Sequence, residues 1–144
     1  MRIKEFLNHN LLLVDGAMGT QIQNRNPGAA AWGAYEGCNE WLNLSAPEII
    51  RDIHAAYFAA GCDAVETNSF GASPLTLGEY QLTARAREIA RAAAQIARGA
   101  ANEAAQQSGR PRYVLGSVGP GTKLVTLGQV TYDELYGGYQ EQMT

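Results

Sequence analysis

Three short apolar runs alternate with amphipathic segments along the chain. The first run is "LLLV" at residues 11–14, and the other two cover residues 64–67 and 113–118. A short, continuous apolar run is typical of a strand that is buried on both faces of a parallel sheet. We therefore expect residues 11–14 to form such a strand and the two later runs to form two more.

The segment between the first two strands contains a clearly marked helix. Ser45 and Glu48 have the spacing of a capping box, and Pro47 suits a first helical turn. Gly61 favours the left-handed conformation that ends a helix. We expect a helix from Ser45 to Gly61, and its apolar stripe consists of Ile50, Ile53, Tyr57 and Ala60.

Further helices are expected elsewhere in the chain. Residues 82–104 carry apolar side chains at helical spacing, and "SGRP" at residues 108–111 ends that pattern. Thr131 and Glu134 form a second capping box, which predicts a helix that continues to the last residue. The apolar face of this helix consists of Tyr132, Leu135, Tyr139 and Met143. A short helix is expected over residues 18–24.

The alternation of strands and helices predicts an α/β fold in one domain, residues 1–144. The connections are long enough for crossovers between parallel strands. In a parallel sheet the carboxyl ends of all strands lie at one edge, and ligands bind there whether the sheet stays open or closes into a barrel. We therefore expect the functional site at this edge.

Composition limits the kinds of partner. The chain has 144 residues, of which 46% are apolar, and a formal charge of −3. A single globular domain of this charge does not attract nucleic acid or anionic membrane surfaces. No apolar run approaches the roughly 20 residues of a membrane span. With only two cysteines, Cys38 and Cys62, the chain is expected to be cytoplasmic, and the pairing of these cysteines is left open.

Polar residues and glycines follow each predicted strand. Asp15 and Gly16 follow the first, residues 66–68 (ETN) end the second, and Ser117 with residues 119–122 (GPGT) follows the third. Glycines let the backbone approach a ligand, while carboxylates and hydroxyls orient it. The three strand ends together favour a site for a small polar substrate. Each residue taken alone is also an ordinary turn or capping residue, and that alternative stays open.

Several other motifs do not fit their patterns. "GSVGPGTK" at residues 116–123 lacks the lysine that directly follows the last glycine of a phosphate loop. "GAMGT" at residues 16–20 lacks the full dinucleotide fingerprint. His9 and His54 do not have metal-ligand spacing. Lys123 lies beyond a glycine-rich loop, which disfavours an unrelated aldolase or lyase.

Three longer motifs resemble one family. They are "DGAMGT" at residues 15–20, "LSAPEIIRDIHAAYFAAGCDAVETNSFGAS" at residues 44–73 and "GSVGP" at residues 116–120. In combination they are similar to the start of the homocysteine S-methyltransferase domain of cobalamin-dependent methionine synthases. The resemblance implies the first three or so strand–helix units of a (β/α)8 TIM barrel, incomplete in this chain. The parent domain would transfer a methyl group from methylcobalamin to the zinc-bound thiolate of homocysteine.

The same resemblance implies roles for individual residues. Asp15 and Gly16 would contact the amino-acid end of homocysteine, with Thr67 nearby, and Ser117 would join them from the third strand end. The three zinc cysteines of the family lie on later strands, and neither cysteine of this chain matches them. No residue of this chain is therefore expected to be catalytic or to hold zinc or methylcobalamin, and the chain alone is expected to be inactive.

The implied partners are homocysteine, the rest of the barrel, and the cobalamin- and folate-binding domains of the parent. Two alternatives stay open. One is a methyltransferase that uses another donor, such as S-methylmethionine or betaine, and the other is a non-catalytic fragment that binds an amino acid. An incomplete barrel would leave a strand edge unpaired, so self-association through that edge is also expected.

Overall fold

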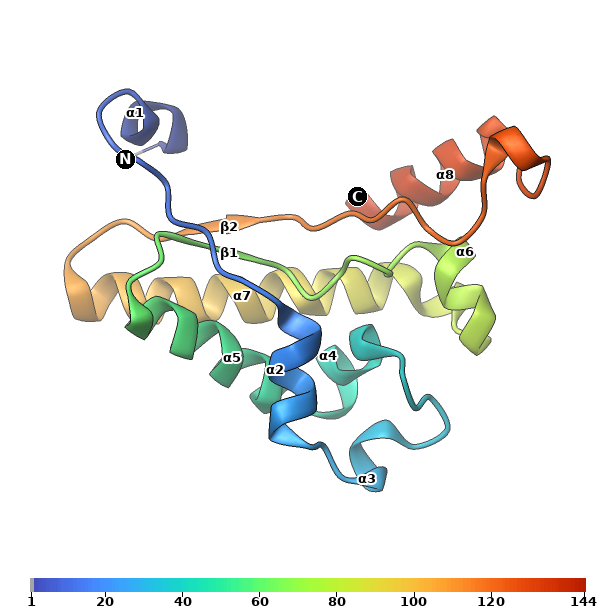
Figure 1. Cartoon of the computed structure of the whole chain (residues 1–144), viewed down its shortest axis with the longest axis horizontal. Helices are drawn as coiled ribbons and strands as arrows, with labels where there is room; N and C mark the ends of the chain where they lie inside the picture. The colour runs from blue at the N-terminus through green and yellow to red at the C-terminus, as the bar shows by residue number, and fades with distance from the viewer. Residues whose placement is uncertain (1) are drawn as a thin grey trace.

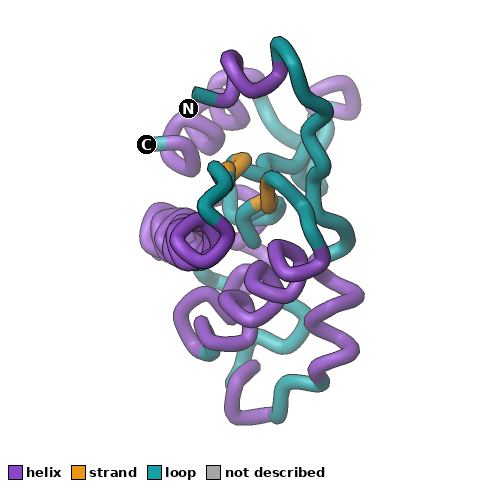
Figure 2. Tube along the Cα trace, turned by 90° about the vertical axis from the view of Figure 1, so that its left-hand side faces the viewer, coloured by secondary structure: helices purple, strands orange, loops and turns teal. Residues whose placement is uncertain are grey.

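A small parallel sheet lies at the centre of the computed structural model, which describes residues 2–144 (Figure 1). Strand β1 (Ala64–Glu66) pairs in parallel with β2 (Tyr113–Leu115), and Ala64 lies opposite Tyr113. Helices α5 (Pro47–Ala60) and α7 (Ala86–Ser108) cover one side of these strands, while α1 (Ile3–Leu7) and α8 (Tyr132–Met143) lie on the other. Viewed at 90° to this, the strands lie between helical layers (Figure 2).

Shorter elements fill the connections. They are α2 (Met18–Arg25), α3 (Ala29–Trp32), α4 (Leu42–Ser45), α6 (Pro74–Leu77), and four 3-10 turns at Asn39–Trp41, Gly78–Tyr80, Thr83–Arg85 and Val125–Leu127. The expected α/β class, the parallel pairing and the short helix after residue 17 are confirmed. None of the helices in residues 2–144 is long and apolar enough to cross a bilayer.

The first predicted strand, residues 11–14, runs parallel to β1 but forms only one bridge, between Val14 and Ala64. The backbone N–H of Asp63 and that of Ala64 donate to the Leu13 carbonyl at 2.7 and 3.1 Å. The expectation that this strand is buried on both faces is wrong, because Leu11 is 88% exposed and Leu13 60% exposed. Within residues 2–144 this segment bridges only to β1, on one edge, and its apolar side chains stay in contact with solvent.

Helix α5 begins two residues later than its predicted cap. Ser45 is the last residue of α4, and its hydroxyl donates to the Trp41 carbonyl at 3.3 Å. Ala46 takes the N-cap position and makes no side-chain capping bond. The predicted Ser45–Glu48 capping box is therefore wrong, because the preceding short helix includes Ser45. Gly61 ends α5 with φ of 109°, as expected.

The buried face of α5 differs in part from the predicted stripe. Ile50 and Ile53 are completely buried, as expected, but Ala60 is exposed. His54 and Phe58 are buried in its place. Phe58 packs with Val65 of β1 and with the small side chains of α7, whose buried stripe is Ala86, Ile89, Ala93, Ala97, Ala100 and Ala101. This stripe confirms the predicted helix, and its small residues let α7 approach both α5 and the sheet.

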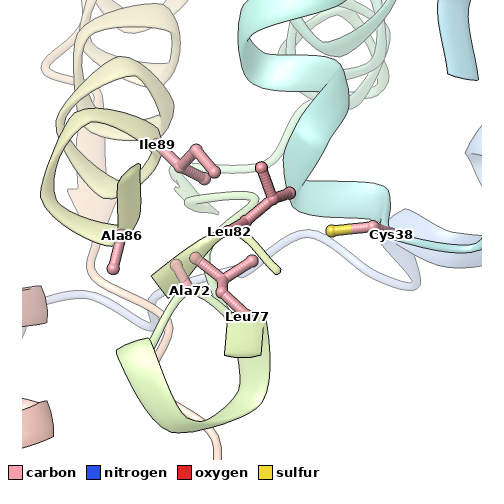
Figure 3. Close-up of a cluster of buried hydrophobic side chains, with 6 residues drawn as sticks. All are labelled: Cys38, Ala72, Leu77, Leu82, Ala86 and Ile89. Carbon is pink, nitrogen blue, oxygen red and sulfur yellow. The ribbon is translucent and has the colours of Figure 1, made fainter. Parts of the chain in front are cut away.

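A second buried cluster supports the segment that follows α3. It contains Cys38, Ala72, Leu77, Leu82, Ala86 and Ile89, and the Cys38 sulfur points toward Leu82 (Figure 3). A third cluster joins Ile22 of α2 to Leu42, Ile50 and Ile53. The two clusters anchor α2 and residues 38–45 beside the carboxyl ends of the strands.

Helix α8 has the predicted capping box. The Glu134 N–H donates to the Thr131 hydroxyl at 3.2 Å, and the Thr131 N–H donates to the Glu134 carboxylate at 2.8 Å. Its predicted apolar face is wrong at both ends, because Tyr132 and Met143 are 68% and 67% exposed. Gly138 and Gln142 are buried instead, and Gly138 lies against Pro74 and Leu75 of α6.

Candidate functional site

A cavity of about 460 Å³ opens at the carboxyl ends of the strands. It brings together all four substrate-binding residues that were predicted from the sequence, which are Asp15, Gly16, Thr67 and Ser117. The other lining residues are Ala17, Met18, Gly19, Asn39, Glu40, Glu66, Asn68, Ser69 and Phe70. Three strand ends, the start of α2 and the 39–40 turn therefore form one site.

Asp15 is held in this wall by the neighbouring strand. Its Oδ1 accepts a hydrogen bond from the Glu66 N–H at 3.0 Å. Burial, together with the nearby Glu66 carboxylate, raises the pKa of Asp15 to about 6, against the opposing effect of the hydrogen bond from the Glu66 N–H. At neutral pH Asp15 is mainly ionised, although its partial burial disfavours the charged form. A cationic donor in the cavity would therefore stabilise the Asp15 carboxylate.

Thr67, Ser69 and Ser117 form a closed group of hydrogen bonds, which we call the hydroxyl ring. The Ser117 N–H donates to Thr67 Oγ1 at 2.9 Å, and the Ser69 hydroxyl donates to the Ser117 carbonyl at 2.8 Å. Thr67 Oγ1 lies 2.6 Å from Ser69 Oγ. The Ser117 hydroxyl in turn donates to Glu66 at 3.2 Å. The ring joins the exit of β1 to the exit of β2.

Asn68 fixes a more distant segment to the same wall. Its side-chain amide donates to the Asn39 carbonyl at 2.8 Å and to Asn43 Oδ1 at 3.0 Å. The side-chain amide of Asn43 donates to the Asn68 backbone carbonyl at 2.8 Å. Both Asn43 and Asn68 are buried. The two donors of Asn68 are therefore used within the chain, and the residue acts mainly to position the 39–43 segment.

Glu40 is a cavity residue that the sequence analysis missed. Its Oε1 accepts a bond from the Gly71 N–H at 2.7 Å. A Cβ at Gly71 would lie 2.9 Å from that oxygen, so a larger residue there would displace the Glu40 carboxylate from its present position. Glu40 lies in a segment without hydrophobic periodicity, and only its long-range bond to residue 71 brings it to the site. No local sequence signal marks it.

The charged side chains that line the cavity are all acidic. Asp15, Glu40 and Glu66 line it, and none of the Lys, Arg or His side chains in residues 2–144 does. The N-cap residue of α2, Ala17, makes no side-chain capping bond, and Ala17, Met18 and Gly19 line the cavity. The first N–H groups of a helix have no partners within it. The wall thus combines acceptors for a cation with backbone donors for an anion.

The glycine-rich loop after β2 has a different role from the one expected. Residues 119–122 do not line the cavity. Gly119 instead packs against Phe70, where an added Cβ would lie 2.6 Å from the ring and 2.7 Å from the Phe70 carbonyl oxygen. The Gly119 N–H donates to that oxygen at 2.9 Å. The glycine therefore allows two strand exits to pack together and does not approach a ligand.

Neither cysteine fits a zinc site here. Cys38 and Cys62 are buried and free, they belong to different clusters, and neither lines the cavity. Burial raises the pKa of each thiol to about 11, which opposes the thiolate form that binds zinc. In residues 2–144 no group of three or more His, Cys, Asp or Glu side chains is placed to hold a metal.

Comparisons with known proteins identify the family of this chain. The profile described as homocysteine S-methyltransferase matches residues 12–144, so the chain belongs to this family. The chain is 44% identical over 137 residues to a methionine synthase of Mycobacterium tuberculosis. It is 42% identical to a methionine synthase of Mycobacterium leprae. Each alignment covers 95% of this chain and 11% of the relative.

Solved structures show the same fold. The chain is similar to the homocysteine methyltransferase MmuM from Escherichia coli in its oxidised and metallated forms, with a TM-score of 0.71 and 21% identity in both cases. The similarity covers 97% of this chain and 53% or 54% of those chains. The chain therefore spans about half of these structures and about a ninth of the curated methionine synthases.

Proposed function

We propose that residues 1–144 are the first part of a (β/α)8 barrel that binds homocysteine in a methionine synthase. The parent domain would transfer a methyl group from methylcobalamin to the homocysteine thiolate. The membership in the homocysteine S-methyltransferase family supports methyl transfer to homocysteine. The similarity to methionine synthases at 42% and 44% identity supports this branch of the family.

The observation that carries the proposal is the acidic cavity where three parallel strand segments end. An amino acid presents an ammonium group and a carboxylate, and the wall offers a partner for each. Asp15, whose carboxylate is ionised at a cost, would accept bonds from the ammonium group. Gly16 and the first turn of α2 would donate backbone N–H groups to the carboxylate. The homocysteine sulfur would then extend away from this wall.

Zinc and methylcobalamin are proposed for the parent domain alone. The two cysteines of this chain do not fit zinc, as described above, so the proposed zinc ligands are residues of the parent outside these 144. The contribution of this chain would be to bind and orient the amino-acid end of homocysteine, and by itself it would not transfer a methyl group.

Complementation tests this proposal. The 144-residue chain is mixed with a polypeptide that supplies the rest of the barrel and the cobalamin domain of a methionine synthase. We expect homocysteine-dependent formation of methionine from methylcobalamin in the mixture, and none with either polypeptide alone. A folded, zinc-loaded complex that forms no methionine with methylcobalamin, S-methylmethionine or betaine would contradict the proposal. Activity with one of the latter two donors alone would support the alternative donor.

A second candidate is a binding fragment without catalysis. It is favoured by the fact that Asp15, Gly16, Thr67 and Ser117 all line one cavity within this chain. Calorimetry of the chain with homocysteine and methionine separates the cases. Zinc-independent binding that is lost in Asp15→Ala supports a binding role, whereas no binding at millimolar ligand contradicts it.

A further inference from the structure

The hydroxyl ring contains only as many protons as its own bonds require. Ser69 Oγ has one proton, and it points to the Ser117 carbonyl, which can only accept. The 2.6 Å contact between Ser69 and Thr67 must therefore use the proton of Thr67. Thr67 Oγ1 also accepts from the Ser117 N–H. The Thr67 hydroxyl thus has no proton left for a ligand.

Two members of the ring are buried, and Ser69 is also held from a second side. Thr67 is 6% exposed and Ser69 is 6% exposed. The buried Gln142 of α8 donates to the Ser69 carbonyl at 2.6 Å, and the Ser69 N–H donates to the Thr67 carbonyl at 2.8 Å. Because Ser69 is held from both directions, its hydroxyl has a fixed orientation toward Ser117.

We infer that Ser69 is a positioning residue of this site and that Thr67 meets a ligand only as a hydrogen-bond acceptor. Ser69 holds the Ser117 backbone, and Ser117 holds the Glu66 carboxylate through its hydroxyl. Thr67 therefore belongs with the groups that receive the ammonium end of an amino acid, and not with those that receive its carboxylate. The part of this inference that concerns a ligand rests on the proposed function.

Two pairs of variants test the ring. Ser69→Ala removes the hydroxyl, and Ser69→Thr keeps it. Thr67→Val removes the other hydroxyl at nearly the same shape, and Thr67→Ser keeps it. Ser73→Ala is the matched control, because Ser73 is also buried and caps α6 through its hydroxyl but does not line the cavity. Two quantities are measured for each variant: amide hydrogen exchange at Ser117 by NMR and the dissociation constant for homocysteine by calorimetry.

We expect Ser69→Ala and Thr67→Val to speed exchange at the Ser117 amide and to weaken homocysteine binding by roughly fivefold, the usual effect of one hydrogen bond. Ser69→Thr and Thr67→Ser should restore both values. Ser73→Ala should lower the melting temperature but change neither the exchange at the Ser117 amide nor the binding of homocysteine.

Two results would overturn the ring assignment: unchanged Ser117 exchange in Ser69→Ala, or failure of Ser69→Thr to restore it. A wild-type chain that does not bind homocysteine would contradict the proposed function, and the exchange data would still decide the role of Ser69. Equal loss of binding in Ser69→Ala and in Ser73→Ala would indicate a general loss of stability and would also overturn the inference.

Discussion

Replacing Asp15 by Asn should stabilise the chain at neutral pH while weakening its site. Asn keeps the size of the side chain and an oxygen that can accept the Glu66 N–H, which now bonds Asp15 at 3.0 Å. It removes the partly buried negative charge. The change therefore separates the energetic cost of the carboxylate from the local geometry.

The sign follows from the pKa of Asp15, which burial raises from an ordinary value of 3.8 to about 6. Between pH 4 and 6 the native chain keeps a proton that the unfolded chain has released. The contribution of Asp15 to the free energy of unfolding therefore falls as the pH rises through this window and stays lower above it. The full shift corresponds to about 3 kcal/mol. Because Asp15 is partly exposed to solvent, we discount this to about 1 kcal/mol.

Urea denaturation followed by circular dichroism at pH 4 and pH 7.5 measures this effect. We expect Asp15→Asn to gain about 1 kcal/mol over the wild type at pH 7.5 and to lose that advantage at pH 4. The control is Glu103→Gln, which neutralises an exposed carboxylate on α7. Binding of homocysteine by Asp15→Asn should weaken by about tenfold or more, since a charge-assisted bond is lost.

An unchanged or lower stability of Asp15→Asn at pH 7.5 would refute the reasoning. It would mean that the ionised carboxylate is not destabilised by its surroundings. An equal gain in Glu103→Gln would refute it as well, because the effect would then follow from net charge and not from burial of Asp15.

Four further predictions follow from other parts of the molecule. Gly119→Ala should destabilise the chain by about 1–3 kcal/mol in urea melts because the added Cβ would clash with Phe70, and an unchanged midpoint would contradict this packing. Burial lowers the pKa of His54 to about 4, so the contribution of His54 to stability should fall as the pH drops from about 6.5 toward 4, opposite in sign to that of Asp15, and a difference in unfolding free energy between the wild type and His54→Leu that does not change with pH would contradict this. The open edge at residues 11–14 should cause self-association, which sedimentation should show to be reduced in Leu13→Lys, whereas a well-folded wild-type monomer would count against it. N-acetylhomocysteine, which lacks the cationic group, should bind more weakly than the methyl ester of homocysteine in calorimetric titrations, and the reverse order would contradict the acidic cavity.

Local signals predicted the main elements of the fold. The stripe of small residues in α7 and the glycine after α5 depend on neighbours within a few turns, so they can be read from the sequence. The cap at Ser45 could not, because a second short helix competes for the same residue. The exposure of residues 11–14 was also missed, since an apolar run shows what a strand would bury and not which neighbours are present.

The site was predictable where it depends on strand ends. Asp15, Thr67 and Ser117 follow parallel segments, and parallel segments end at the same edge, so their convergence follows from the topology. Glu40 and Ser69 could not be assigned in this way. They depend on hydrogen bonds that span 31 and 48 residues of sequence, and the segment around residue 40 has no periodic pattern.

An NMR titration of the 144-residue chain with homocysteine tests the central claim most directly. We expect saturable amide shifts at Asp15, Gly16, Thr67 and Ser117, and much weaker shifts at the same ligand concentrations in Asp15→Asn. The absence of shifts at millimolar homocysteine, or shifts confined to a second cavity that is lined by Ala59 of α5 and Ala104 of α7, would show that the acidic cavity is not where the amino acid binds.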